Sequence, residues 1–75
     1  SVSIYPNPAT TQIIINSPDL QIIKSELFDY TGRMLVQQQQ GNNASVINTS
    51  SLSNGYYFIK IYTAKGNVIK NFIKN

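Results

Sequence analysis

The stretch GYYFIKIYT, residues 55–63, decides the fold of this 75-residue chain. One alternate set of its side chains, Tyr57, Ile59 and Ile61, is apolar. The other set is amphipathic and consists of Tyr56, Phe58, Lys60 and Tyr62. A period of two in a run of β-branched and aromatic residues predicts a β-strand with one face in the core and the other half-exposed.

A hairpin turn follows this strand at residues 63–67, and a similar turn lies at residues 29–33. Each contains a glycine, Gly66 or Gly32, at a place where a short hairpin loop needs a positive φ angle. The turn at residues 63–67 predicts a further strand over residues 68–74. The turn at residues 29–33 joins predicted strands at residues 21–28 and 34–39.

The rest of the chain continues the β pattern. Residues 12–16 are mostly β-branched, and residues 2–5 form a short strand before them. Turn formers dominate residues 50–55, where Gly55 serves the turn and Leu52 is expected to close the end of the core. About seven short strands with frequent turn signals and no helical period predict an all-β, antiparallel sandwich.

A proline corner, residues 5–10, separates the first two strands. Pro6 and Pro8 fix φ and remove two backbone donors, and each restricts the residue before it to extended conformations. We expect Asn7 to hydrogen-bond its own backbone. The corner then turns the chain into the second strand.

The composition limits the classes of protein. The chain has no Cys and no His, so it forms no disulfide and lacks the commonest metal ligand. A core of this size supplies only about 3–5 kcal/mol, so stability must come from apolar packing, helped by a neighbour. The chain opens with Ser1, which suggests a piece of a larger protein, and no apolar run is long enough to span a membrane.

The net charge of +3 is uneven along the chain. All three acids lie in residues 1–29, whereas five of the six basic residues lie in residues 30–75. A basic half can favour anionic partners such as nucleic acid. The lysines are scattered, however, which favours a sheet surface whose edge strands are kept from pairing. We therefore expect no nucleic-acid partner.

No catalytic, cofactor-binding or metal-ligating residue can be named from the sequence. General acid–base chemistry needs a positioned titrating group, most often His, or a pair of carboxylates. Glu26 and Asp29 are three residues apart on an extended chain and point to opposite faces. Asp19 and Asp29 lack the spacing of a calcium site and suit turns better. The sequence predicts neither an enzyme nor a cofactor.

Four blocks of sequence, in order, resemble the C-terminal sorting domain (type A) of the type IX secretion system of Bacteroidetes. They are YPNPAT at residues 5–10, LFDYTGRMLV at 27–36, LSNGYYFIKI at 52–61 and the lysine-bearing strand VIKNFIKN at 68–75. The residues that carry the motif or its turns are Pro6, Asn7, Pro8, Gly32, Arg33, Leu52, Gly55, Tyr57 and Gly66. Gln12 and Asn48 stand near places where the family often has acids.

The resemblance implies an immunoglobulin-like sandwich in residues 1–75, at the C-terminus of a larger secreted protein. It implies a secretion signal and not an enzymatic activity. The type IX translocon recognises such domains after transit through the periplasm, and a sortase-like signal peptidase commonly removes them at the cell surface. The resemblance implies that the cut would lie upstream of the domain and that the N-terminal cargo would be released or joined to a surface glycolipid.

The final strand is the expected contact with the translocon. Side chains that do not build the core should be recognised, and an edge strand also offers unpaired backbone groups. Lys70, Phe72 and Lys74 are the candidates. An edge strand also provides a means of self-association.

Two other interpretations stay open at this point. A carbohydrate-binding or adhesive immunoglobulin-like module would use the aromatic row of Tyr56, Phe58 and Tyr62. Cross-strand aromatic pairs that only stabilise the sheet explain the same row more simply. A spacer domain that stabilises its parent protein is the third class.

Overall fold

The computed structural model describes residues 2–75, apart from the side chain of Gln40. The described residues form strands and no helix. The strands are β1 (Ser3–Tyr5), β2 (Gln12–Asn16), β3 (Ile22–Asp29), β4 (Met34–Asn42), β5 (Ala44–Asn48), β6 (Gly55–Thr63) and β7 (Gly66–Lys74). The strands predicted from the sequence are all found, and their ends differ from the predicted ones by at most three residues.

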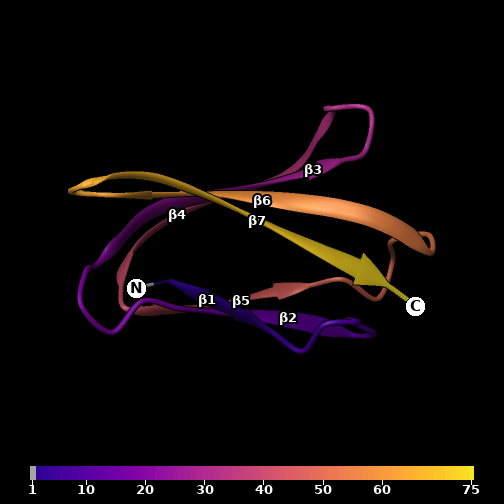
Figure 1. The fold of residues 1–75 in the computed structure, drawn as a ribbon, viewed down its shortest axis with the longest axis horizontal. Coiled ribbons are helices and arrows are strands. Elements are labelled where there is room, and N and C mark those ends of the chain that lie inside the picture. The colour runs from indigo at the N-terminus through magenta and orange to yellow at the C-terminus, as the bar shows by residue number, and fades with distance from the viewer. Residues whose placement is uncertain (1) are drawn as a thin grey trace.

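The strands form two antiparallel sheets that lie one above the other (Figure 1). One sheet has the order β1-β2-β5 and the other the order β4-β3-β6-β7. β6 lies inside its sheet and pairs with β7 without interruption from Gly55↔Lys74 to Thr63↔Gly66. This confirms the predicted all-β sandwich, and it places β7 at one edge of the larger sheet.

The core lies between the inner faces of the two sheets. The ring of Phe72 stacks on that of Tyr57, with 5.6 Å between the centroids. Leu52 is partly buried against the core cluster, as expected for a residue that closes its end. Each fully buried aliphatic side chain contributes roughly 1.5–3 kcal/mol. The largest fully buried apolar side chains are Ile13, Ile15, Ile22, Leu27, Ile47, Ile59, Ile61 and Phe72.

The two hairpin turns carry glycine in the predicted conformation, although the second loop is shorter than residues 63–67, because Thr63 already pairs with Gly66. Gly32 and Gly66 have φ angles of 91° and 122°, in the region that favours glycine. Asp29 closes the first turn, because its Oδ1 accepts hydrogen bonds of 3.0 Å from the backbone N–H groups of Thr31 and Arg33. The hydrogen bond from the Thr31 hydroxyl is the main cause that lowers the pKa of Asp29 below its usual 3.8.

β4 passes from one sheet toward the other. Only Asn43 separates its end at Asn42 from the start of β5, which belongs to the smaller sheet. Its pairing with β3 is also irregular, with register shifts between Ile22 and Lys24 and between Leu27 and Phe28. The second edge of the larger sheet is therefore bent, in contrast to β7.

Candidate recognition site along the C-terminal strand

The proline corner lies beside the end of β7. The side-chain Oδ1 of Asn7 accepts a hydrogen bond of 3.0 Å from the backbone N–H of Ile73. Ala9 donates its N–H to the carbonyl oxygen of Ile73 at 2.7 Å and accepts the N–H of Asn75 at 2.9 Å. The expectation that Asn7 bonds its own backbone is therefore corrected, because its oxygen is used to hold the last residues of β7.

The structure also corrects the placement of two of the three expected recognition residues, Lys70, Phe72 and Lys74. The side chain of Phe72 is only 1% exposed, that of Lys74 is 7% exposed, and Lys70 is half-buried. The expectation that they lie outside the core is wrong for Phe72 and Lys74. The reason is the register, since Phe72 pairs with Tyr57 and a strand's alternate residues share one face.

Lys74 is buried with a partner for its charge. Its Nζ donates a hydrogen bond of 3.2 Å to the carbonyl oxygen of Leu52, in the connection before β6. A lysine can bury its aliphatic stem in this way while the ammonium group reaches a polar partner at the rim. Lys74 thus ties the C-terminal strand to the loop that closes the core.

Some residues of β7 direct their backbone N–H and C=O groups away from β6. Ile73 directs its N–H and C=O away from β6, towards the proline corner. Backbone groups alternate along a strand, so those of Asn67, Ile69 and Asn71 point to the same side. No strand lies there in the described chain, because β7 ends the sheet. We call the backbone groups of these three residues the open edge.

The aromatic row of β6 is largely covered by its neighbours. Phe58 stacks on Phe28 of β3, with 5.1 Å between the ring centroids. The Tyr62 hydroxyl donates to Glu26 Oε1 at 2.7 Å, and Lys24 Nζ lies 4.5 Å from the centre of the Tyr62 ring. Of the row, only Tyr56 is well exposed, at 66%. The row therefore stabilises the sheet and does not form a free aromatic platform.

Glu26 is the centre of this polar cluster on the outer face of the larger sheet. It also accepts a hydrogen bond of 3.0 Å from Gln37 Nε2 and lies 3.7 Å from Lys24 Nζ. The Tyr62 hydrogen bond is the main cause that lowers the pKa of Glu26 below its usual 4.5, with Gln37, Lys24 and Lys60 acting in the same direction. The carboxylate is therefore held in its charged form.

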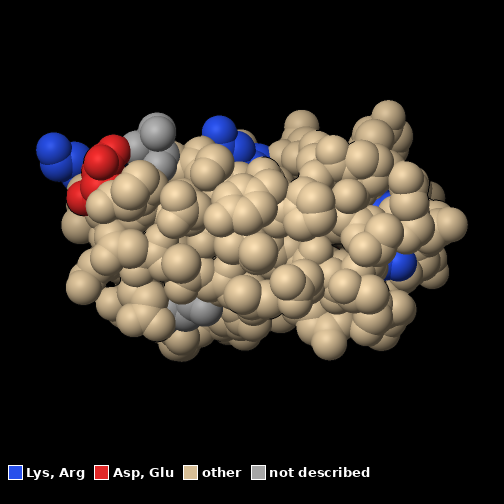
Figure 2. All heavy atoms as spheres, turned by 90° about the horizontal axis from the view of Figure 1, so that it is seen from below, with Lys and Arg blue, Asp and Glu red and all other residues tan. Residues whose placement is uncertain are grey.

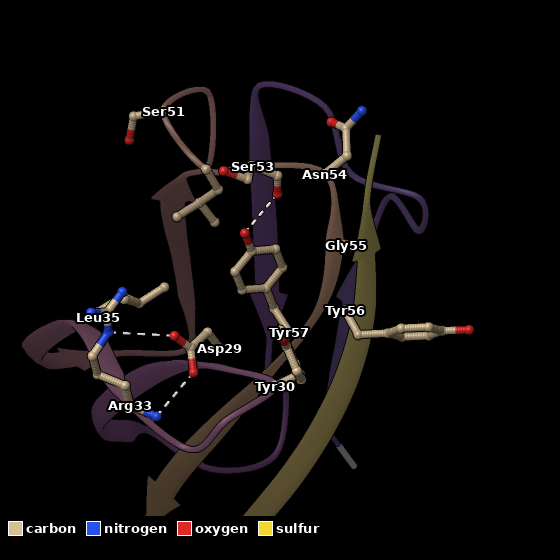
Figure 3. Close-up of a pocket in the computed structure, with 11 residues that line it drawn as sticks. Asp29, Tyr30, Arg33, Leu35, Ser51, Ser53, Asn54, Gly55, Tyr56 and Tyr57 are labelled. Atoms are coloured by element: carbon tan, nitrogen blue, oxygen red, sulfur yellow. Dashed lines mark hydrogen bonds and ion pairs between the residues drawn. The ribbon is translucent and has the colours of Figure 1, made fainter.

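A hollow of about 400 Å³ lies at the end of the sandwich, beside the first hairpin turn (Figure 3). Tyr57 points towards Ser53, to whose carbonyl oxygen its hydroxyl donates at 2.6 Å, whereas Tyr56 points away (Figure 3). Asp29 and Arg33 face each other across the turn at 3.4 Å. Within the described residues no three His, Cys, Asp or Glu side chains are placed to hold a metal ion. The polar groups here serve turns and loops.

Residues 3–75 match the family model of the secretion system C-terminal sorting domain. The chain belongs to this family. The family is one of type IX secretion signals and not of enzymes, and the link to Bacteroidetes follows from it. A signal of this kind interacts with the type IX secretion machinery and directs export to the cell surface or the extracellular space.

The fold of the sorting domain is similar to part of a solved structure. That structure is PorZ, an essential surface component of the type IX secretion system of Porphyromonas gingivalis. The match covers 100% of this chain and 11% of PorZ, with a TM-score of 0.82 and 23% sequence identity. It confirms the immunoglobulin-like sandwich. No curated protein matches the sorting domain, and residues 2–75 contain no helix long and apolar enough to cross a membrane.

Apart from Gly32 and Gly66 in the hairpin turns, the motif residues of the sorting domain lie at two places. Arg33, Leu52, Gly55 and Tyr57 all line the hollow at the end of the sandwich. Pro6, Asn7 and Pro8 lie at the end of β7, and both prolines follow cis peptide bonds. The motif thus gathers residues that close the core and residues that hold the C-terminal strand.

Charged side chains are unevenly distributed over the sorting domain. β1, β2 and β5 contain no Asp, Glu, Lys or Arg. The face seen from below is accordingly almost free of charge, with charged groups only at its margins (Figure 2). The lysines belong to the larger sheet and its turns, on both faces, so the basic half of the sequence forms no single basic surface there.

Sequence reasoning expected an edge at the final strand but did not name its outward residues Asn67, Ile69 and Asn71, and it missed the contact of Asn7 with Ile73. No local signal named these residues, because both alternate sets of β7 contain apolar residues and its inner face depends on the pairing of Phe72 with Tyr57. No signal existed for the contact of Asn7, since its partners are 66 residues apart.

Proposed function

We propose that this sorting domain directs an attached N-terminal cargo protein across the outer membrane through the type IX secretion system. Residues 1–75 act as one unit at the C-terminus of a larger secreted protein, which passes through the periplasm. A sortase-like signal peptidase then removes the domain at the cell surface. The observation that carries this proposal is the family match over residues 3–75, the whole described fold apart from Val2.

The arrangement of β7 supports recognition at the C-terminal strand. Lys70 is half-buried beside the free side of the strand, and the open edge offers backbone groups for pairing. Phe72 and Lys74 act indirectly, because the stacked ring and the bond to Leu52 hold the strand in place. The translocon then contacts the edge of β7 and not the buried side chains.

A reporter fusion tests the proposal. A periplasmic reporter carrying residues 1–75 at its C-terminus is expressed in a bacterium with a type IX system and in the same strain without a functional translocon. We expect the reporter outside the cell in the first strain only. Mass spectrometry should show that the exported reporter has lost the domain, and that a peptidase-deficient strain retains it. A folded fusion that stays in the periplasm of the first strain would refute the sorting role.

Deleting the C-terminal residues is a poor test of recognition. A deletion of residues 70–75 removes Phe72 and Lys74, and with them a buried ring and a buried hydrogen bond. The fold and the recognised surface would be lost together. Substitutions that change only the open edge separate the two effects.

A further inference from the structure

We propose that the secretion machinery recognises the sorting domain by adding an extended strand of its own to the open edge of β7, at Asn67, Ile69 and Asn71. This inference rests on the proposed sorting function and names how its partner binds. Strand addition to an exposed edge obtains affinity from main-chain hydrogen bonds and specificity from alternate side chains. The following observations select this edge and describe the strand that fits it.

β7 is the most regular edge in the described chain. It pairs with β6 over its whole length without a register shift. β4, at the other edge of the same sheet, has two register shifts against β3 and turns into β5. Irregularity of this kind is a common protection of edges against pairing. In the smaller sheet, the edge strands β1 and β5 have only 3 and 5 residues.

The open edge has defined ends. Upstream, the turn closes at Gly66, whose carbonyl oxygen accepts a hydrogen bond of 2.9 Å from the Thr63 hydroxyl. Downstream, Asn7 and Ala9 already use the backbone groups of Ile73. Between these ends, three residues each offer one N–H and one C=O. A partner strand of about five residues is therefore the length that this edge accepts.

The side chains at the open edge define the partner's chemistry. On the outer face, Ile69 is 60% exposed between Asn67 and Asn71, so an apolar residue opposite Ile69 gains contact area. On the inner side, Lys70 lies at a position that is not hydrogen-bonded to the incoming strand, where paired side chains come closest. An acidic residue of the partner strand opposite Lys70 forms an ion pair with it. The partner strand thus carries an apolar residue next to an acidic one.

A second copy of this chain does not provide that strand. Every acid of the sequence lies in residues 1–29, and β7 contains none. If two β7 strands paired in antiparallel fashion about Ile69, each Lys70 would face Val68 of the other copy and no acid. Lysine on an edge strand is a usual means of preventing such self-pairing. The charge of Lys70 therefore selects a partner other than the domain itself.

The substitution Asn71→Pro tests strand addition directly. The N–H of Asn71 points away from β6, so Asn71→Pro removes an outward donor and leaves the β6–β7 hydrogen bonds intact. Asn71→Ala, which keeps the N–H, is the matched control. We expect Asn71→Pro to lower export of the reporter fusion about tenfold or more. The variant loses the hydrogen bond from the Asn71 N–H to the partner strand, and the proline ring also blocks the approach of that strand. Asn71→Ala should be exported like the unchanged fusion.

Two further measurements make the outcomes decisive. Circular dichroism of each purified domain shows whether it is folded, and if Asn71→Pro is not folded, Ile69→Pro and Lys70→Glu replace it. Lys70→Glu keeps every backbone group and should also lower export. Folded edge variants that are exported as well as the unchanged fusion refute strand addition and leave the sorting function standing. Failure of the unchanged fusion itself would count against the sorting function instead.

Discussion

Asn7 accepts, through its side-chain oxygen, a hydrogen bond of 3.0 Å from the backbone N–H of Ile73, which lies 66 residues further along the chain. With the two bonds of Ala9, it joins the leading family motif to the last residues of the chain. The beginning and the end of the domain are therefore one structural unit. The hydrogen bonds of the proline corner to Ile73 and Asn75 mark where the open edge of β7 ends.

Asn7→Ala should destabilise the domain by about 0.5–1.5 kcal/mol, the net value of one hydrogen bond. Urea unfolding measures this change. Hydrogen exchange should accelerate most at the Ile73 amide, which loses its acceptor. Asn67→Ala changes an exposed side chain on β7, the strand that contains Ile73. It is the control and should leave both measurements unchanged. Equal exchange at Ile73 in the two variants would contradict the role of Asn7.

Phe72→Ala should cost about 3–5 kcal/mol, because it leaves a cavity beside Tyr57 in the core. This is comparable to the whole stability of a domain of this size. We expect the near-ultraviolet circular dichroism of the variant to be largely lost at 37 °C. Phe72→Leu, which fills most of the volume, should remain folded. A folded Phe72→Ala domain would show that the ring is not needed for the core.

Lys74→Ala should destabilise the domain more than Lys70→Ala. The Lys74 ammonium group donates to the carbonyl oxygen of Leu52, and hydrogen bonds of charged groups contribute about 1.5–3 kcal/mol. Within residues 2–75, no hydrogen bond of this kind ties the half-buried Lys70 to the loop. Thermal unfolding of both variants at the same pH gives the comparison. A smaller effect at position 74 than at position 70 would contradict the structural role of the buried lysine.

Glu26 should make stability depend on pH on the acid side. Its pKa in the folded domain lies below the usual 4.5, so the charged carboxylate stabilises the fold above that pH. The contribution is lost as the pH falls through the lower, folded pKa. Glu26→Gln should therefore melt below the unchanged domain at neutral pH, and the difference should shrink in acid. Asp29 acts in the same direction at lower pH, since its pKa is lowered from 3.8.

Gly32→Ala should destabilise the first hairpin by about 1–2 kcal/mol, because its φ of 91° is unfavourable for any residue with a Cβ. Gly41→Ala is the matched control. Neither glycine has an atom within 4 Å of an added Cβ, and only Gly32 has a positive φ. Gly41→Ala should be neutral or slightly stabilising by its effect on the unfolded chain. Equal melting temperatures for the two variants would refute the conformational explanation.

Local patterns predicted most of the fold correctly. The alternation in residues 55–63 identified β6, and the glycines at positions 32 and 66 identified two hairpins, because these signals act within a few residues. The sequence did not predict β5 as a separate strand, since the short run at residues 44–48 mixes polar and apolar residues without flanking prolines. The aromatic row was visible as a pattern, but its covering by Phe28, Glu26 and Lys24 depends on the neighbouring strand.

The sequence by itself determined the β class, the turns and the family, because alternation, glycine placement and ordered motifs are read along the chain. Only the tertiary structure decided which face of β7 enters the core. Both alternate sets of that strand contain apolar residues, so the choice depends on the pairing of Phe72 with Tyr57. It also decided that Asn7 holds Ile73, because a contact between the two ends exists only once both sheets have formed.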